Sequence, residues 1–181
     1  MAVSRDVRYH EAAHAVAAYT LGIGLKEESM ILISDQKACV NVTDLPADEI
    51  DEDWFIQRVG AKLAGPLAMC LLRNERLEWD TLKDSGEYHT DFEESLCIFA
   101  EYWRRVGGGC SNEQVDEQMN RAACIALKCV QNNEGAIIAV VDATAGRDQF
   151  SRTEITSTVL ACCQYPPAIP MKAVVHYDEM E

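Results

Sequence analysis

The segment His-Glu-Ala-Ala-His at residues 10–14 constrains this chain more than any other feature. It lies in a run rich in alanine, the residue with the highest helix propensity. The run predicts a helix over about 5–21, and the glycines at 22 and 24 are predicted to end it. A helix gives the two histidines of the segment a fixed spatial relation.

In that helix, His10 and His14 leave the same face one turn apart. Their ring nitrogens can then reach one Zn²⁺ at ~2.1 Å each. Glu11 points about 100° away from His10 and is placed to contact a water molecule beside the ion. Two ligands and a general base in this spacing are typical of zinc-dependent peptidases. Two histidines and a carboxylate also suit other first-row metal ions.

A hydrolytic zinc site needs a third protein ligand and one open position. The remaining histidines are His89 and His176, and His176 lies in a proline-rich segment that offers a poor platform. Asp91 stands in the first turn of a predicted helix, with Thr90 as its predicted cap. These residues leave Asp91 and His89 as rival third ligands, and residue type slightly favours His89.

The rest of the chain predicts a mainly α fold with a small β-hairpin. Hydrophobic periodicity and capping signals predict helices over about 52–73, 91–105, 112–132, 134–145 and 152–162. Two short β-type runs, Met30–Ile33 and Cys39–Val42, are predicted to form the hairpin. Pro66, after Gly65, should kink or interrupt the helix over 52–73.

Composition narrows the class of protein. With 181 residues, 48% of them apolar, the chain can bury one core, and its net charge of −14 argues against nucleic acid and anionic membranes as partners. No apolar run reaches the ~20 residues of a membrane span, and the N-terminus lacks a signal peptide pattern.

None of the eight cysteines forms a C-x-x-C pair. We therefore expect a cytoplasmic protein with reduced thiols.

Several segments, in order and spacing, resemble the peptidase domain of the FtsH family. Tyr9–Ala17 is similar to the family's A-H-E-A-G-H-A start, and Lys62–Ala68 to its L-x-G-R-A-A-E helix. Gly86–Glu94 is similar to G-A-x-N-D-L-x-x-A. The likeness extends over about residues 5–160 and includes the segments Met30–Ile33, Cys39–Thr43, Leu45-Pro46, Val115–Gln118, Asn132–Glu134 and Phe150–Ile155.

The resemblance implies a zincin-like HExxH peptidase domain, followed by a C-terminal helical bundle, within a single domain over 1–181. The zinc site would fall in 1–106, the helical part in 107–165 and an irregular tail in 166–181. It implies Asp91 as the third ligand of one Zn²⁺ per chain. His89 and Thr90 would then lie at the rim of the cleft or contact a ligand, or His89 would be an ordinary loop residue.

The chain also departs from the family pattern. Ala13 replaces a glycine, and Pro66 and Met69 replace the Arg and Glu of the family helix. We expect neither an ATPase module nor a membrane anchor in these residues. The resemblance therefore implies a stand-alone peptidase domain, with a ring-like homo-oligomer and a separate ATPase as possible partners.

The function predicted from the sequence is a zinc-dependent endopeptidase that cleaves unfolded or flexible polypeptides without ATP. An extended substrate would pair with the hairpin edge near Ile31, Ile33, Val40 and Val42, although the hairpin would serve equally well as a cover for the core. Two alternatives stay open. One is a non-catalytic assembly module that keeps the fold, and the other is a regulatory protease with one specific partner.

Overall fold

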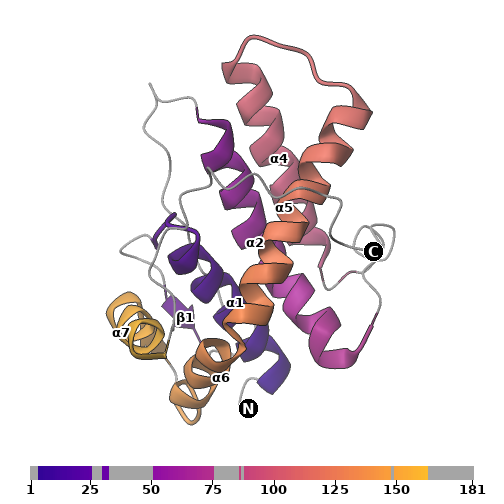
Figure 1. The fold of residues 1–181 in the computed structure, drawn as a ribbon. Helices are drawn as coiled ribbons and strands as arrows, with labels where there is room; N and C mark the ends of the chain where they lie inside the picture. The colour runs from indigo at the N-terminus through magenta and orange to yellow at the C-terminus, as the bar shows by residue number, and fades with distance from the viewer. Residues whose placement is uncertain are drawn as a thin grey trace.

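The structure, a computed structural model, describes residues 4–25, 30–32, 51–75, 86, 88–147 and 149–162. Within these ranges the chain forms six helices and two short strands (Figure 1). Their bounds are α1 Arg5–Thr20, β1 Met30–Leu32, α2 Glu52–Arg73, α4 His89–Arg105, α5 Asn112–Asn132, α6 Glu134–Ala143, β2 Gln149–Ser151 and α7 Arg152–Cys162. The prediction of a mainly α fold is confirmed.

Helix α2 is the centre of the fold and packs against α1, α4 and α5 (Figure 1). Its buried face includes the small residues Gly60, Ala61, Ala64 and Gly65. Small side chains let neighbouring helices approach closely. A Cβ on Gly60, for example, would lie 3.3 Å from the Ala122 carbonyl oxygen of α5.

Pro66 does not interrupt α2, which is one continuous helix of 22 residues. Proline removes one backbone hydrogen bond from a helix interior. Here Gly65 and Pro66 are both buried between neighbouring helices, and this packing holds the helical conformation on both sides of the proline. Tertiary contacts therefore outweigh the local breaking signal.

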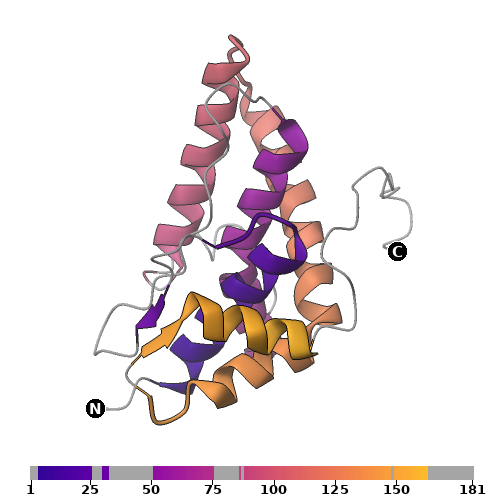
Figure 2. The same ribbon diagram turned by 90° about the vertical axis from the view of Figure 1, so that its left-hand side faces the viewer.

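Helices α4 and α5 run antiparallel and meet at a turn at one end of the molecule (Figure 2). Gly107 in this turn has φ +73°, a value that favours glycine. Ser111 begins α5 with a capping box, in which its hydroxyl accepts from the Gln114 N–H and its own N–H donates to the Gln114 side chain. Trp103 donates to Gln118 across the pair at 3.2 Å.

Helices α6 and α7 pack together against α1. The capping box predicted at the start of α7 is confirmed, because the Ser151 N–H donates to the Glu154 carboxylate at 2.9 Å and the Glu154 N–H donates back to the Ser151 hydroxyl at 3.4 Å. Arg8 of α1 donates to the Val141 carbonyl oxygen of α6 at 3.2 Å. The C-terminal helices are thus attached to the helix that carries the histidines.

The strand predicted at Met30–Ile33 is confirmed over Met30–Leu32, but its described partner is distant in sequence. β1 pairs antiparallel with β2, with Ile31 opposite Phe150. The other strand of the predicted hairpin, Cys39–Val42, lies outside the described residues. The three residues Gln149–Ser151 show no clear alternation of apolar and polar side chains, so the sequence did not predict this strand.

One described helix, α2, is long and apolar enough to cross a membrane, and 72% of its most apolar stretch is buried inside the fold. Helices α5 and α6 would meet the same test only as a pair, and they are bent by 69° at their junction. Both features also fit core helices of a globular protein.

A single hydrophobic cluster joins residues from α1, α2, α4, α5, α6, β2 and α7. It runs from Tyr9 to Val159, so it draws on both the 1–106 and the 107–165 ranges. Its largest fully buried side chains include Phe55, Leu63 and Ile137.

Leu63→Ala should destabilise the protein by about 2–5 kcal/mol, because Leu63 is fully buried at the centre of α2 and its truncation leaves a cavity. Leu71→Ala is the matched control. Leu71 lies on the same helix but is 43% exposed, so its loss should cost less than about 1 kcal/mol. Urea denaturation of both variants measures the difference, and equal losses would contradict a core centred on α2.

Candidate metal centre

Helix α1 places His10 and His14 one turn apart on the face that looks toward α2 and the start of α4. Ser4 caps the helix by accepting from the Val7 N–H at 3.3 Å. His14 is buried, and its Nδ1 lies 2.8 Å from the Ala61 carbonyl oxygen of α2. A carbonyl oxygen only accepts, so Nδ1 carries the proton and Nε2 of the neutral ring carries the lone pair.

Asp91 enters from the first turn of α4. The helix begins at His89 with Tyr88 as its N-cap residue, so the prediction that Thr90 caps the helix is wrong. Thr90 lies exposed inside the first turn, whereas Tyr88 is 3% exposed. The helix therefore starts at a buried residue that makes no side-chain cap hydrogen bond. Ser95 donates to the Asp91 carbonyl oxygen at 2.7 Å one turn later.

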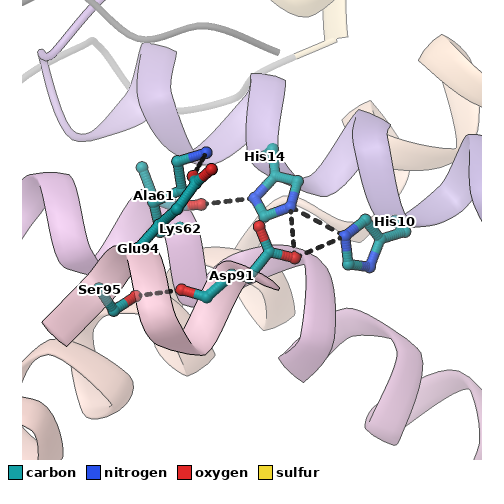
Figure 3. A network of polar contacts seen from close by, with 7 residues as sticks. All are labelled: His10, His14, Ala61, Lys62, Asp91, Glu94 and Ser95. Atoms are coloured by element: carbon teal, nitrogen blue, oxygen red, sulfur yellow. Dashed lines mark hydrogen bonds and ion pairs between the residues drawn. The ribbon is translucent and has the colours of Figure 1, made fainter. Parts of the chain in front are cut away.

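The three side chains converge on one point (Figure 3). Nε2 of His10 lies 3.0 Å from Oδ2 of Asp91 and 3.0 Å from Nε2 of His14. Nε2 of His14 lies 3.4 Å from the same Asp91 oxygen. Residues far apart in the sequence thus form a compact triangle of two nitrogens and one oxygen.

This triangle fits a zinc ion by both spacing and donor type. In a tetrahedral zinc site with bonds of ~2.05 Å, neighbouring ligand atoms are about 3.3 Å apart, and the observed edges are 3.0, 3.0 and 3.4 Å. Two imidazole nitrogens and a carboxylate oxygen are common zinc ligands. Lone pairs this close repel one another unless a proton or a cation lies between them.

Asp91 and His14 also shift each other's pKa values. Burial by itself would raise the pKa of Asp91, but the His14 and His10 rings reverse this and hold that pKa far below its usual range. Burial would lower the pKa of His14, but the charge and hydrogen bond of Asp91 raise it above the ordinary 6.5. The carboxylate thus stays ionised, and a proton is the natural competitor of a metal ion at His14.

Glu11 also lies within electrostatic reach of the site, because its charge contributes to raising the pKa of His14. Its side chain is partly exposed. In the part of the chain that the structure describes, its carboxylate has no hydrogen bond or ion pair. Lys62 of α2 has the reverse effect and lowers the pKa of His14, and it forms an ion pair with Glu94 at 2.5 Å (Figure 3).

Gly65 lets the two histidine rings lie against α2. A Cβ on Gly65 would lie 2.4 Å from Nε2 and 2.7 Å from Cε1 of His14, and 2.8 Å from Cε1 of His10. No side chain fits in that space without moving a ring. The glycine is therefore required by the site itself and not by backbone conformation.

The other predicted site residues are placed as follows. His89 and Thr90 are exposed at the start of α4, two residues and one residue before Asp91. Ile31 lies in β1, which packs against α1. Ile33, Val40 and Val42 lie outside the described residues.

The sequence reading missed three contributors to the site: Gly65, the Ala61 carbonyl and Tyr88. The Lys62–Ala68 segment contained the signal for Gly65, since its glycine is one of the few positions that agree with the family's L-x-G-R-A-A-E helix. The Ala61 contact comes from a backbone carbonyl, which every residue has, so the residue type at this position does not indicate it. Tyr88 stacks on His10 at 6.1 Å between ring centroids, which becomes visible only in three dimensions.

Searches against known protein families and against curated proteins found no match to this chain. The likeness to the FtsH peptidase domain therefore rests on the motifs and their order.

Gly65→Ala should weaken zinc binding by at least about tenfold, because the new methyl group pushes the His14 and His10 rings out of the triangle. A competition titration with a chromophoric chelator measures the affinity. Gly135→Ala is the control, since a Cβ at this helical glycine of α6 meets nothing within 4 Å. That variant should bind zinc normally and gain up to about 1 kcal/mol of stability. Equal zinc affinity in both variants would contradict the role of Gly65.

Proposed function

We propose that this protein is a zinc-dependent endopeptidase that hydrolyses peptide bonds in unfolded or flexible polypeptides. The observation that carries the proposal is the triangle of His10 Nε2, His14 Nε2 and Asp91 Oδ2, with edges of 3.0–3.4 Å. Glu11, next to the first ligand on the same helix, supplies a carboxylate beside it. A structural metal site has no need of a carboxylate in that position.

The three ligands would hold one Zn²⁺, which when bound acts as a Lewis acid and makes water more acidic. Residues of the chain orient the ligands and transfer the protons. The Ala61 carbonyl fixes the His14 tautomer, so that Nε2 presents its lone pair. The Glu11 carboxylate accepts a proton from the attacking water and passes it to the leaving amine nitrogen.

The motif resemblance supports the same proposal and adds to it a zincin-like peptidase domain. In that reading, Asp91 is the carboxylate ligand, as the family's G-A-x-N-D-L-x-x-A motif implies. The substrate would be an extended segment, because a peptide that binds by backbone pairing has to be unfolded locally. A folded protein would require a separate unfolding machine.

Glu11→Gln should lower the rate of casein cleavage by at least about 100-fold, because it removes the general base. It should leave zinc stoichiometry at one per chain, since Glu11 is not a ligand in this proposal. Glu117→Gln, an exposed carboxylate on α5, is the matched control and should retain full activity. Zinc content by atomic absorption and release of labelled peptides from unfolded casein are the two measurements.

A wild-type protein that binds no zinc would contradict the proposal. A protein that binds zinc but cleaves nothing, with Glu11→Gln indistinguishable from wild type, would favour the non-catalytic assembly module. Cleavage of one partner alone, with casein left intact, would favour the regulatory protease.

A further inference from the structure

The two histidines of the site are held in different ways. His14 is fixed by the hydrogen bond from its Nδ1 to the Ala61 carbonyl oxygen at 2.8 Å. His10 has its Nε2 in the triangle, but among the described residues its Nδ1 has no hydrogen-bond partner. A metal-binding histidine normally donates its second ring nitrogen to an acceptor that fixes the ring. Within the described residues, the His10 ring instead lies against an aromatic ring, that of Tyr88.

Tyr88 provides a surface of the right kind. Its ring lies parallel to that of His10, with an interplanar angle of 7° and 6.1 Å between centroids. Offset parallel rings at this separation attract one another and restrict rotation. Tyr88 is also 3% exposed, while the side chain of His10 is 15% exposed. Burial of Tyr88 limits the movement of its ring.

Tyr88 is itself held at its hydroxyl end. Arg73, the last residue of α2, donates to the Tyr88 hydroxyl oxygen at 2.9 Å. The same guanidinium donates to Asp6 of α1 at 3.1 Å. Asp6 and His10 are four residues apart on α1 and share one face. The contacts thus link α1, the end of α2 and the start of α4 around His10.

The position of Tyr88 also ties His10 to Asp91. Tyr88 is the N-cap residue of α4, and Asp91 lies three residues later in the first turn. A shift of the Tyr88 ring would therefore change the surface against which His10 stacks. It would also move the start of α4, the helix that carries Asp91.

We propose that Tyr88 is a positioning residue that holds the His10 ring in the orientation for metal binding, with Arg73 anchoring its hydroxyl. This inference rests on the proposed function, because it assigns His10 a metal to bind. Tyr88 contacts neither substrate nor metal in this proposal. It acts through the His10 ring.

The test compares Tyr88→Leu with Tyr88→Phe. The leucine variant removes the aromatic ring and should bind zinc about 10–100-fold more weakly. The phenylalanine variant keeps the ring and removes the hydroxyl that accepts from Arg73, so it should restore the affinity to within about tenfold of wild type. Chelator competition measures all three affinities.

Phe99→Leu is the matched control for lost packing. Phe99 is a 1% exposed aromatic on the same helix, α4, and lies outside the triangle. This variant should lose thermal stability as Tyr88→Leu does, yet bind zinc like wild type. An equal loss of zinc affinity in Phe99→Leu would overturn the proposal, because general loosening would then explain the effect.

A second measurement does not depend on metal. In the metal-free protein, NMR should show that the His10 ring protons change their chemical shifts in Tyr88→Leu but not in Tyr88→Phe, with His14 unaffected. If wild type binds zinc and Tyr88→Leu binds it equally well, the positioning role is wrong and the proposed function stands. If wild type binds no zinc, the proposed function fails, and unchanged His10 shifts would overturn the positioning of this ring as well.

Discussion

The close approach of α1 and α2 is the constraint on which the candidate site depends. It is possible because small residues occupy the contact, above all Gly65, where a methyl group would enter the space of both imidazole rings. The approach also brings the Ala61 carbonyl within 2.8 Å of His14. One helix contact therefore creates both the space for the rings and the hydrogen bond that selects a tautomer.

The carboxylate of Asp91 is the part of the site that depends most on its neighbours for its charge. Its burial opposes ionisation, and two neighbouring imidazole rings reverse that effect. A carboxylate held ionised in such a place attracts a cation or a proton. Because α4 packs on α2 and α2 packs on α1, the position of this charge is linked to the core of the whole molecule. Truncation of a buried residue on α2 is therefore expected to affect the site as well as stability.

The C-terminal part supports the same helix from the other side. Helices α6 and α7 pack on α1, and the pairing of β1 with β2 brings together segments more than a hundred residues apart. Arg8 joins α1 to the end of α6 through the Val141 carbonyl. The helix that carries the histidines is thus enclosed by elements from both halves of the chain.

Local signals in the sequence were enough to predict most helices. The bounds of α2 and α5 agree with the prediction, and the capping box at Ser151 marked the start of α7. These features depend on residues within one or two turns of each other, so a sequence displays them directly. The start of α4 differed, since the helix begins at His89 with the buried Tyr88 as its N-cap residue and Thr90 lies inside the first turn.

The sequence by itself determined that His10 and His14 share one helix face, since the spacing of four residues and the helix period require it. It left Asp91 and His89 as rivals until a family resemblance favoured Asp91. Only the tertiary structure decided that the Asp91 carboxylate meets both rings while His89 stays exposed. The stacking of Tyr88 on His10 was likewise decided by the tertiary structure, because it depends on how separate helices pack. Residue spacing along the chain carries no information about the distance between these two rings.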